Sequence, residues 1–182
     1  MNLLGTKRIE TPRLLLRPFV PEDAEAMYRN WASDPAVTEF LTWPPHSGPE
    51  VTRRLLEDWC SRYTEGSCFQ WGIELKSLGE VIGSIAAVKL NEVTEAADLG
   101  YCLGKPWWGQ GLMPEALRAV LDYLFDQVGL GRAAACHDPR NPKSGRVMEK
   151  AGMKLEGTWR QAGRNNLGIC DEVWHSMIRS DR

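Results

Sequence analysis

Apolar positions along the chain switch between the strand period of two and the helical period of 3.6, and the switches divide the chain into elements. Strand-like runs occur at residues 11–17, 69–75, 81–90, 97–103, 133–136, 154–160 and 170–178. Helical spacing predicts helices over residues 21–33, 49–63, 112–129 and 142–151, with an irregular segment at 34–49. Strands that precede helices and then alternate with them predict one α/β domain over residues 1–182, a mixed sheet with helices on both faces.

The most informative stretch is the turn at residues 103–115, which leads from a strand-like run into an amphipathic helix. Gly109 and Gly111 let the backbone approach a ligand and aim several N–H groups at one point, where the helix dipole also favours a phosphate. Pro114 is tolerated in the first helical turn, because its missing N–H would be unpaired there. No Lys-Ser/Thr pair follows Gly111, and the third glycine of a dinucleotide fold is absent. On spacing alone, a phosphate site and a plain strand–helix turn are equal alternatives.

Composition narrows the choice mainly by exclusion. The 182 residues, 43% of them hydrophobic, suffice for one full core. A formal net charge of -2 without a basic block argues against a nucleic-acid partner. No apolar run approaches the ~20 residues of a membrane span, and no secretory signal pattern opens the chain. The five cysteines and three histidines match no metal-ligand spacing, so we expect buried thiols in a cytoplasmic protein, without disulfides or a metal site.

Taken together, several motifs resemble the N-acetyltransferase superfamily that uses acetyl-coenzyme A (acetyl-CoA), the GNAT fold, and within it the RimJ/RimL-type ribosomal-protein branch. The resemblance covers nearly the whole chain and rests on Glu10–Arg17, Asp98–Tyr101, Trp108–Leu117, Asn141–Met153 and Glu156–Gly157. It implies a mostly antiparallel mixed sheet with one parallel strand pair. The strand at Leu99–Leu103 and the strand near Ala133–Cys136 would run parallel and splay apart.

The resemblance also implies a binding mode for coenzyme A. The glycine turn would hold the pyrophosphate with Trp108, Gly109, Gln110, Gly111, Leu112 and Met113. The pantetheine arm would lie between the splayed strands, bonded to the backbone of Tyr101, Cys102 and Leu103. In relatives an N–H of this strand binds the thioester oxygen, by position that of Cys102, where negative charge builds as the amine attacks. Pro106 stands where much of the superfamily has Arg or Gln, which removes one phosphate contact.

Two residues at the start of the fourth predicted helix have a structural and a functional interpretation. Asn141, followed by a proline, has the residue type of a helix N-cap. Similar enzymes use this Asn to bond the coenzyme arm as well, and the two roles are compatible. They also use the Ser at the position of Ser144 to protonate the departing thiolate, although a hydroxyl is a poor acid without help.

Asp98 stands where many relatives carry a Glu that acts as the general base. The alternative is a surface-strand carboxylate or an ion-pair partner for Arg132 or Arg140. Asp is one carbon shorter than Glu, and the acidic residue that some ribosomal-protein acetyltransferases carry after the Glu-Gly strand corresponds to Gly163 here. Catalysis could then rest on positioning and the oxyanion donor, with water removing the proton.

The remaining question is the acceptor. Trp43 lies in a proline-bounded segment that in the family forms the acceptor-side wall, whereas most other tryptophans fall in periodic runs typical of a core. The predicted reaction moves acetyl from acetyl-CoA directly to a primary amine. A protein α-amino group, with a pKa near ~8, is more available at pH 7 than a Lys near ~10.4, which favours a protein N-terminus. A small-molecule amine (polyamine, amino acid or aminoglycoside) and a non-catalytic CoA-binding sensor are the alternatives.

Overall fold

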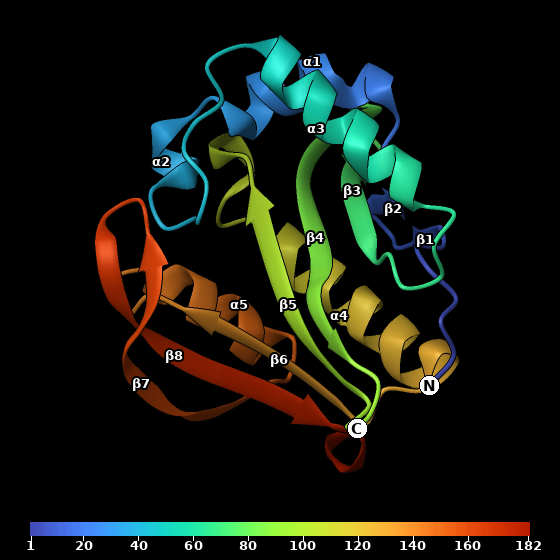
Figure 1. Cartoon of the computed structure of the whole chain (residues 1–182), viewed down its shortest axis with the longest axis vertical. Coiled ribbons are helices and arrows are strands. Elements are labelled where there is room, and N and C mark those ends of the chain that lie inside the picture. The colour runs from blue at the N-terminus through green and yellow to red at the C-terminus, as the bar shows by residue number, and fades with distance from the viewer.

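A computed structural model describes residues 1–182, in which all strands join in one eight-stranded sheet (Figure 1). The strands run in the order β1-β2-β3-β4-β5-β6-β8-β7, and β5 with β6 is the one parallel pair. They are β1 (Ile9–Glu10), β2 (Leu14–Arg17), β3 (Gln70–Leu75), β4 (Glu80–Asn91), β5 (Ala96–Leu103), β6 (Arg132–His137), β7 (Lys154–Asn165) and β8 (Gly168–Ile178). The predicted mixed, mostly antiparallel α/β fold is confirmed.

Helices cover both faces of this sheet, as Figure 1 shows. On one side lie α1 (Ala24–Met27), α2 (Pro35–Thr38) and α3 (Pro49–Arg62), and on the other α4 (Leu112–Tyr123) and α5 (Pro142–Lys150). A 3₁₀ turn before α1 and π turns after α1 and α4 complete the predicted helices over 21–33 and 112–129. The irregular segment expected at 34–49 is corrected by α2, whose cap residue Asp34 accepts a hydrogen bond from the N–H of Ala36 (2.8 Å).

Two apolar cores hold the layers together. The larger lies between the sheet and α4 and includes Trp71, Leu117 and Phe125, all fully buried. The smaller lies under α1 and α3, around Trp31 and Leu56. Full burial of one such side chain stabilises the fold by about 1.5–3 kcal/mol, so both helix layers are held firmly against the sheet.

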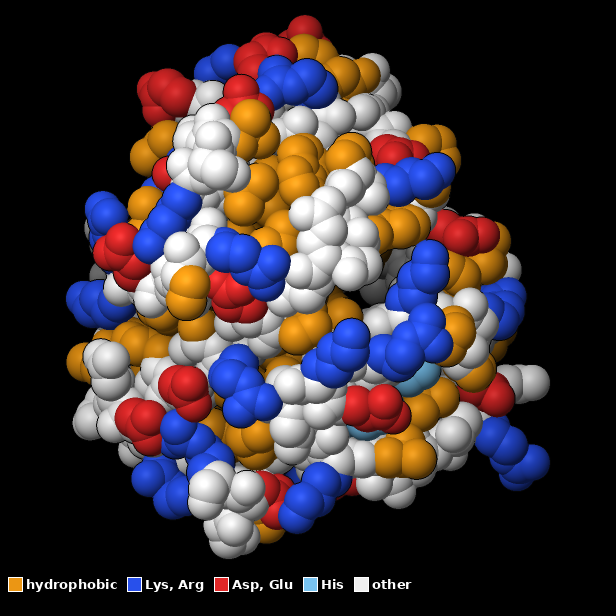
Figure 2. Space-filling view, turned by 180° about the vertical axis from the view of Figure 1, so that it is seen from behind, with side chains coloured by type: hydrophobic (Ala, Val, Ile, Leu, Met, Phe, Trp, Pro, Cys, Tyr) orange, Lys and Arg blue, Asp and Glu red, His pale blue; other side chains and the backbone are white.

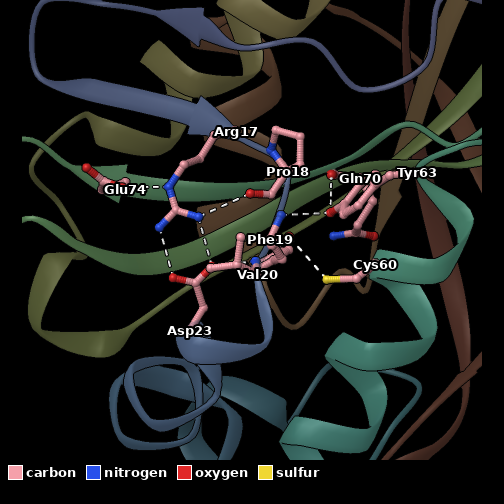
Figure 3. Close-up of polar contacts among 9 residues, drawn as sticks. All are labelled: Arg17, Pro18, Phe19, Val20, Asp23, Cys60, Tyr63, Gln70 and Glu74. Atoms are coloured by element: carbon pink, nitrogen blue, oxygen red, sulfur yellow. Dashed lines mark hydrogen bonds and ion pairs between the residues drawn. The ribbon is translucent and has the colours of Figure 1, made fainter.

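Arg17, the last residue of β2, fixes the start of α1 against the sheet (Figure 3). Its guanidinium donates to Glu74 on β3 (2.6 Å) and to both carboxylate oxygens of Asp23 (2.8 Å each). Tyr63, just after α3, accepts a hydrogen bond from the N–H of Phe19 (2.9 Å) in the same region. Half-buried, charge-assisted bonds of this kind are stronger than exposed ion pairs. The start of α1 is therefore fixed against β2 and β3.

The last two strands are longer than the sequence predicts. The apolar alternation stops near residue 160 because the next positions are mostly polar or glycine and half of the hairpin is exposed. Gln161 has a left-handed φ of 51°, within an irregularity of the pairing between Trp159 and Gly163. The hairpin continues beyond this bulge to Asn165 and resumes at Gly168. Tertiary pairing thus extends a strand whose local sequence lacks the strand pattern.

Candidate active site

The sheet opens at its centre, because β5 and β6 pair only over their first residues. The parallel register joins Ala96 with Arg132 and Asp98 with Ala134 and goes no further, although both strands continue. Figure 1 shows the two strands diverging from this point. The predicted splay is present, and it creates a gap with a closed end at Asp98.

The backbone of β5 turns alternate N–H groups toward β4 and toward the gap. The N–H of Gly104 donates to a β4 carbonyl (2.8 Å), and Cys102 pairs with Ser84 in the same register, so its N–H also faces β4. The N–H groups of Tyr101 and Leu103 therefore face the gap. This corrects the expectation that the backbone of Cys102 bonds the pantetheine arm and the thioester oxygen. Sequence spacing places a residue on a strand but does not give the edge toward which its N–H points.

The glycine turn presents five consecutive backbone N–H groups, from Gly109 to Met113, that donate no hydrogen bond within the chain. Gly109 and Gly111 have φ values of 77° and 74°, the left-handed region that glycine adopts without strain. A Cβ at Gly109 would meet no atom within 4 Å, so the space before the turn is open. Free donors at the positive end of α4 suit a phosphate. The geometry favours the phosphate site over a plain turn.

Arg13 holds this turn in place, a role that the sequence did not predict. Its guanidinium donates to the carboxylate of Glu115 (2.7 Å) and to the carbonyl of Gln110 (2.8 Å). Glu115 also accepts a hydrogen bond from the hydroxyl of Thr11 (2.6 Å). Burial raises the pKa of Glu115, but the hydrogen bonds from Thr11 and Arg13 outweigh burial and hold that pKa below its usual value. The Thr-Pro-Arg motif near the N-terminus thus fixes, through hydrogen bonds, a turn about a hundred residues away in the sequence.

Two contacts cross the gap from the β5 side to α5. The hydroxyl of Tyr101 donates to the carbonyl of Ser144 (3.0 Å) and lies 3.0 Å from its Oγ. Burial raises the pKa of Tyr101, so this hydroxyl keeps its proton at neutral pH. Nearer the turn, Nζ of Lys143 lies 5.4 Å from the ring centroid of Trp108. The first turn of α5 is therefore held opposite β5.

Asn141 occupies the N-cap position of α5, but its side chain makes no capping hydrogen bond, contrary to the expectation for an Asn there. The carbonyl of Asn141 instead accepts the N–H of Ser144 (3.1 Å), and the side-chain amide forms no hydrogen bond within the chain. Exposed cations, Lys143 and Arg146, follow on the same helix. From behind, Figure 2 shows a hollow in this face with Lys and Arg side chains on its rim. The site is thus lined by donors and positive charge.

Asp98 points to the opposite face of β5 from its two neighbours, which are buried in the larger core. It is half-buried and forms no hydrogen bond or ion pair. Its alternative partners are engaged elsewhere, because Arg132 binds Glu156 and Arg140 binds Asp138, each at 2.6 Å. The structure therefore leaves an unpaired carboxylate at the closed end of the gap.

The segment that contains Trp43 lies on the side of the sheet to which the Asp98 side chain points. The Trp43 ring packs on the smaller core and lies 5.2 Å from the ring of His46. Asn166, in the turn between β7 and β8, donates from its side-chain amide to the carbonyls of Thr38 and Trp43 (2.8 Å each). The loop after α2 and the β7–β8 turn are thus joined (Figure 1).

Comparison with known proteins supplies the family. The Acetyltransferase (GNAT) domain matches residues 13–154. The chain belongs to the GNAT acetyltransferase family. It is an acetyl-CoA-dependent N-acetyltransferase, as the sequence motifs predicted.

Three similar proteins show how much of the chain resembles known GNAT acetyltransferases. The uncharacterized N-acetyltransferase YoaA of Bacillus subtilis is 31% identical over 171 residues, which cover 94% of this chain and 96% of the relative. The ribosomal protein uS5-alanine N-acetyltransferase of Escherichia coli is 29% identical over 160 residues, 82% of this chain and 79% of the relative. The solved structure of RimL, a ribosomal L7/L12 alpha-N-protein acetyltransferase in complex with coenzyme A, superposes with a TM-score of 0.84 at 22% identity. It covers 97% of this chain and 100% of its own, and at that identity it shows the shared fold.

Other features of this GNAT protein bear on its chemistry. No group of three or more His, Cys, Asp or Glu side chains is arranged to hold a metal ion. The cysteines are free thiols, but only Cys68 is fully buried and the other four are half-buried, which differs from the expectation. None of the helices combines the length and the hydrophobicity that crossing a membrane requires.

Proposed function

We propose that this acetyltransferase modifies the α-amino group of a protein N-terminus. The observation that carries the proposal is the unpaired carboxylate of Asp98 at the closed end of the gap, on the face opposite the core with α4. An α-amino group, with a pKa near ~8, loses its proton to such a weak base more readily than a Lys near ~10.4. The name of the similar Escherichia coli enzyme, the ribosomal protein uS5-alanine N-acetyltransferase, supports the same acceptor class.

The glycine turn is assigned to the pyrophosphate of the co-substrate. The N–H groups of Gly109, Gln110, Gly111, Leu112 and Met113 supply the donors, and the ring of Trp108 flanks them. The pantetheine arm lies along the free edge of β5, where the N–H groups of Tyr101 and Leu103 pair with it as a neighbouring strand would. The free amide of Asn141 bonds the arm from the other side.

The direction of the arm selects the donor for the thioester oxygen. The arm starts at the turn after Leu103 and runs back along β5 toward its closed end at Asp98. Of the two free N–H groups on this edge, that of Tyr101 is nearer the closed end. We assign it to the thioester oxygen, where it stabilises the negative charge of the tetrahedral intermediate.

The chemistry then follows from these placements. Asp98 takes the proton of the acceptor ammonium, directly or through one water, and the neutral nitrogen attacks the thioester carbonyl carbon. As the C–S bond breaks, the electron pair leaves with sulfur. The thiolate takes a proton from Ser144 Oγ, whose neighbour is the Tyr101 hydroxyl. The second proton of the attacking nitrogen returns Ser144 to its neutral form, and Asp98 releases its proton to water. The products are the N-acetylated amine and free coenzyme A.

A thiol-release assay with acetyl-CoA and a panel of acceptors tests the proposal. The panel contains short peptide amides that begin with Ala or Ser, the same peptides with a blocked N-terminus and one internal Lys, and small amines such as spermidine, an amino acid and an aminoglycoside. Peptides with a free N-terminus should give the highest kcat/KM. Preference for a small amine would overturn the acceptor class. Binding of acetyl-CoA without thiol release for any amine would indicate a sensor.

A further inference from the structure

The carboxylate of Glu172 on β8 occupies space that a side chain at Gly163 would otherwise fill. A Cβ at Gly163 would lie 2.5 Å from Oε1 of Glu172 and 3.0 Å from its carboxyl carbon. The backbone of Gly163 is not left-handed, so this position needs glycine for room rather than for conformation. The absent side chain on β7 thus creates the place in which the Glu172 carboxylate rests.

Glu172 lies on the same face of the sheet as Asp98. Asp98 pairs with Ala134, Cys136 follows two residues later on β6 and pairs with Trp174, and Glu172 is two residues from Trp174. Paired residues, and residues two apart on one strand, share a face. This register brings both carboxylates to the face of Cys136, between them on β6. Burial, Glu172 and Asp98, in that order, raise the pKa of the Cys136 thiol to about 12.

The surroundings of Glu172 suit a cation that the chain itself does not provide. The half-buried carboxylate has no ion-pair partner among the chain's salt bridges. It accepts one hydrogen bond, from Nε1 of Trp174 (3.1 Å). Trp159, directly opposite on β7, has its ring 5.0 Å from that of Trp174 and is 60% exposed. Indole faces and a carboxylate both attract an ammonium group.

We infer that Glu172, with the rings of Trp159 and Trp174, binds the protonated amine of the acceptor before Asp98 removes its proton. The inference rests on the proposed function and names the residue that selects a cationic acceptor. Glu172 acts on binding, whereas Asp98 acts on the chemical step. The substrate class is therefore an amine that arrives as an ammonium ion, with its charge as the recognised feature.

Glu172→Gln tests this division, because it keeps the shape and removes the charge. With the best acceptor of the panel, KM for the amine should rise about tenfold or more, while KM for acetyl-CoA and kcat change less than about threefold. The inhibition constant of the N-acetylated product, which lacks the ammonium, should stay unchanged. Asp171→Asn is the matched control, because Asp171 is the adjacent carboxylate and accepts the N–H of Gln161 at the bulge (2.8 Å). It should leave the amine KM unchanged.

Gly163→Ala provides a second test that keeps the charge. The added methyl would lie 2.9 Å from Cγ as well as 2.5 Å from Oε1 of Glu172, so the whole flexible side chain must rotate away and the amine KM should rise as in Glu172→Gln. An unchanged melting temperature would show that the fold survives. The double variant should show no further rise, because both changes remove one interaction. An unchanged amine KM in Glu172→Gln, or an equal weakening of the acetylated product, overturns the inference and leaves the proposed function intact. A wild-type protein that acetylates no panel member overturns the proposed function itself.

Discussion

The hydroxyl of Tyr101 lies 3.0 Å from the Oγ of Ser144 and donates to the carbonyl of the same residue. This pair joins β5 to α5 across the gap. A serine hydroxyl alone is a poor proton donor, but when its proton leaves, the Tyr101 hydroxyl can turn its own proton from the Ser144 carbonyl to Oγ and stabilise the charge there. The two side chains therefore act together on the departing thiolate.

Ser144→Ala should lower kcat by about tenfold to a hundredfold, less than the 10²–10⁴ of a well-matched general acid. Tyr101→Phe should cause a smaller loss, and the double variant should be no slower than Ser144→Ala, since the tyrosine acts through the serine. Thiol release at saturating substrate measures all three. Losses that multiply in the double variant would show that the hydroxyls act separately.

Gly111→Val should weaken coenzyme A binding at least tenfold, because a branched side chain at φ 74° strains the turn and stands where the phosphate approaches. Gly79→Val is the matched control, with φ 70° in the β3–β4 turn and no atom within 4 Å of its Cβ position. Both should lower the melting temperature similarly, whereas only Gly111→Val should change the calorimetric Kd. Equal affinity in the two variants would remove the turn from the site.

The sequence predicted the order of elements and the glycine turn because local periodicity and glycine placement encode both. It did not predict the brace at Arg13, since that contact joins segments about a hundred residues apart. Nor did it give the edge of β5 that faces the gap, because a bulge and the register with β4 decide whether Cys102 or Tyr101 turns its N–H there. The sequence did not predict a role for Glu172 either, because the proposed role depends on the pairing of its strand with Gly163 on the neighbouring strand.

Asp98→Asn should reduce kcat/KM by about 10²-fold or more at pH 6.5–7.5, where only about a tenth of α-amino groups are neutral. The defect should shrink toward pH ~9, because the amine then needs no base. Coenzyme affinity should not change. Glu92→Gln, an exposed carboxylate in the β4–β5 turn, is the control and should be fully active. A loss that is flat with pH would indicate positioning instead of proton transfer.

Trp43→Ala should raise KM for the amine far more than KM for acetyl-CoA, since the loop that carries it borders the face of Asp98. Because the ring also packs on the smaller core, a modest fall in melting temperature is expected too. Trp59→Ala separates the two effects. Trp59 packs on the same core, 5.4 Å from the ring of Phe19, and should lower the melting temperature without changing either KM. Identical kinetics in both variants would make Trp43 a core residue only.

The burial of His175 predicts that the folded protein loses stability in mild acid. It is 2% exposed, its Nδ1 has no hydrogen-bond partner, and burial together with the nearby His137 lowers its pKa. Below pH ~6.5 the unfolded chain binds a proton that the folded chain does not, so stability falls as the pH falls. The urea midpoint should decrease between pH 7.5 and 5.5, values chosen to lie above the ~4 of ordinary carboxyl groups.

His175→Gln should flatten that decrease without abolishing it, because burial also lowers the pKa of His46. An unchanged slope in the variant would mean that His175 does not govern the acid sensitivity.

The parting of β5 and β6 gives the sheet two edges inside the molecule in addition to those at β1 and β7. An open edge normally invites pairing with another polypeptide, and proteins guard such edges with charge, short strands or a covering element. Here the inner edges face one another, and the Tyr101–Ser144 contact spans them. A bulky strand from a neighbouring protein meets that barrier, whereas a thin extended chain with amide groups of its own can lie along the edge. The protein thus turns a common aggregation hazard into a selective hydrogen-bonding surface.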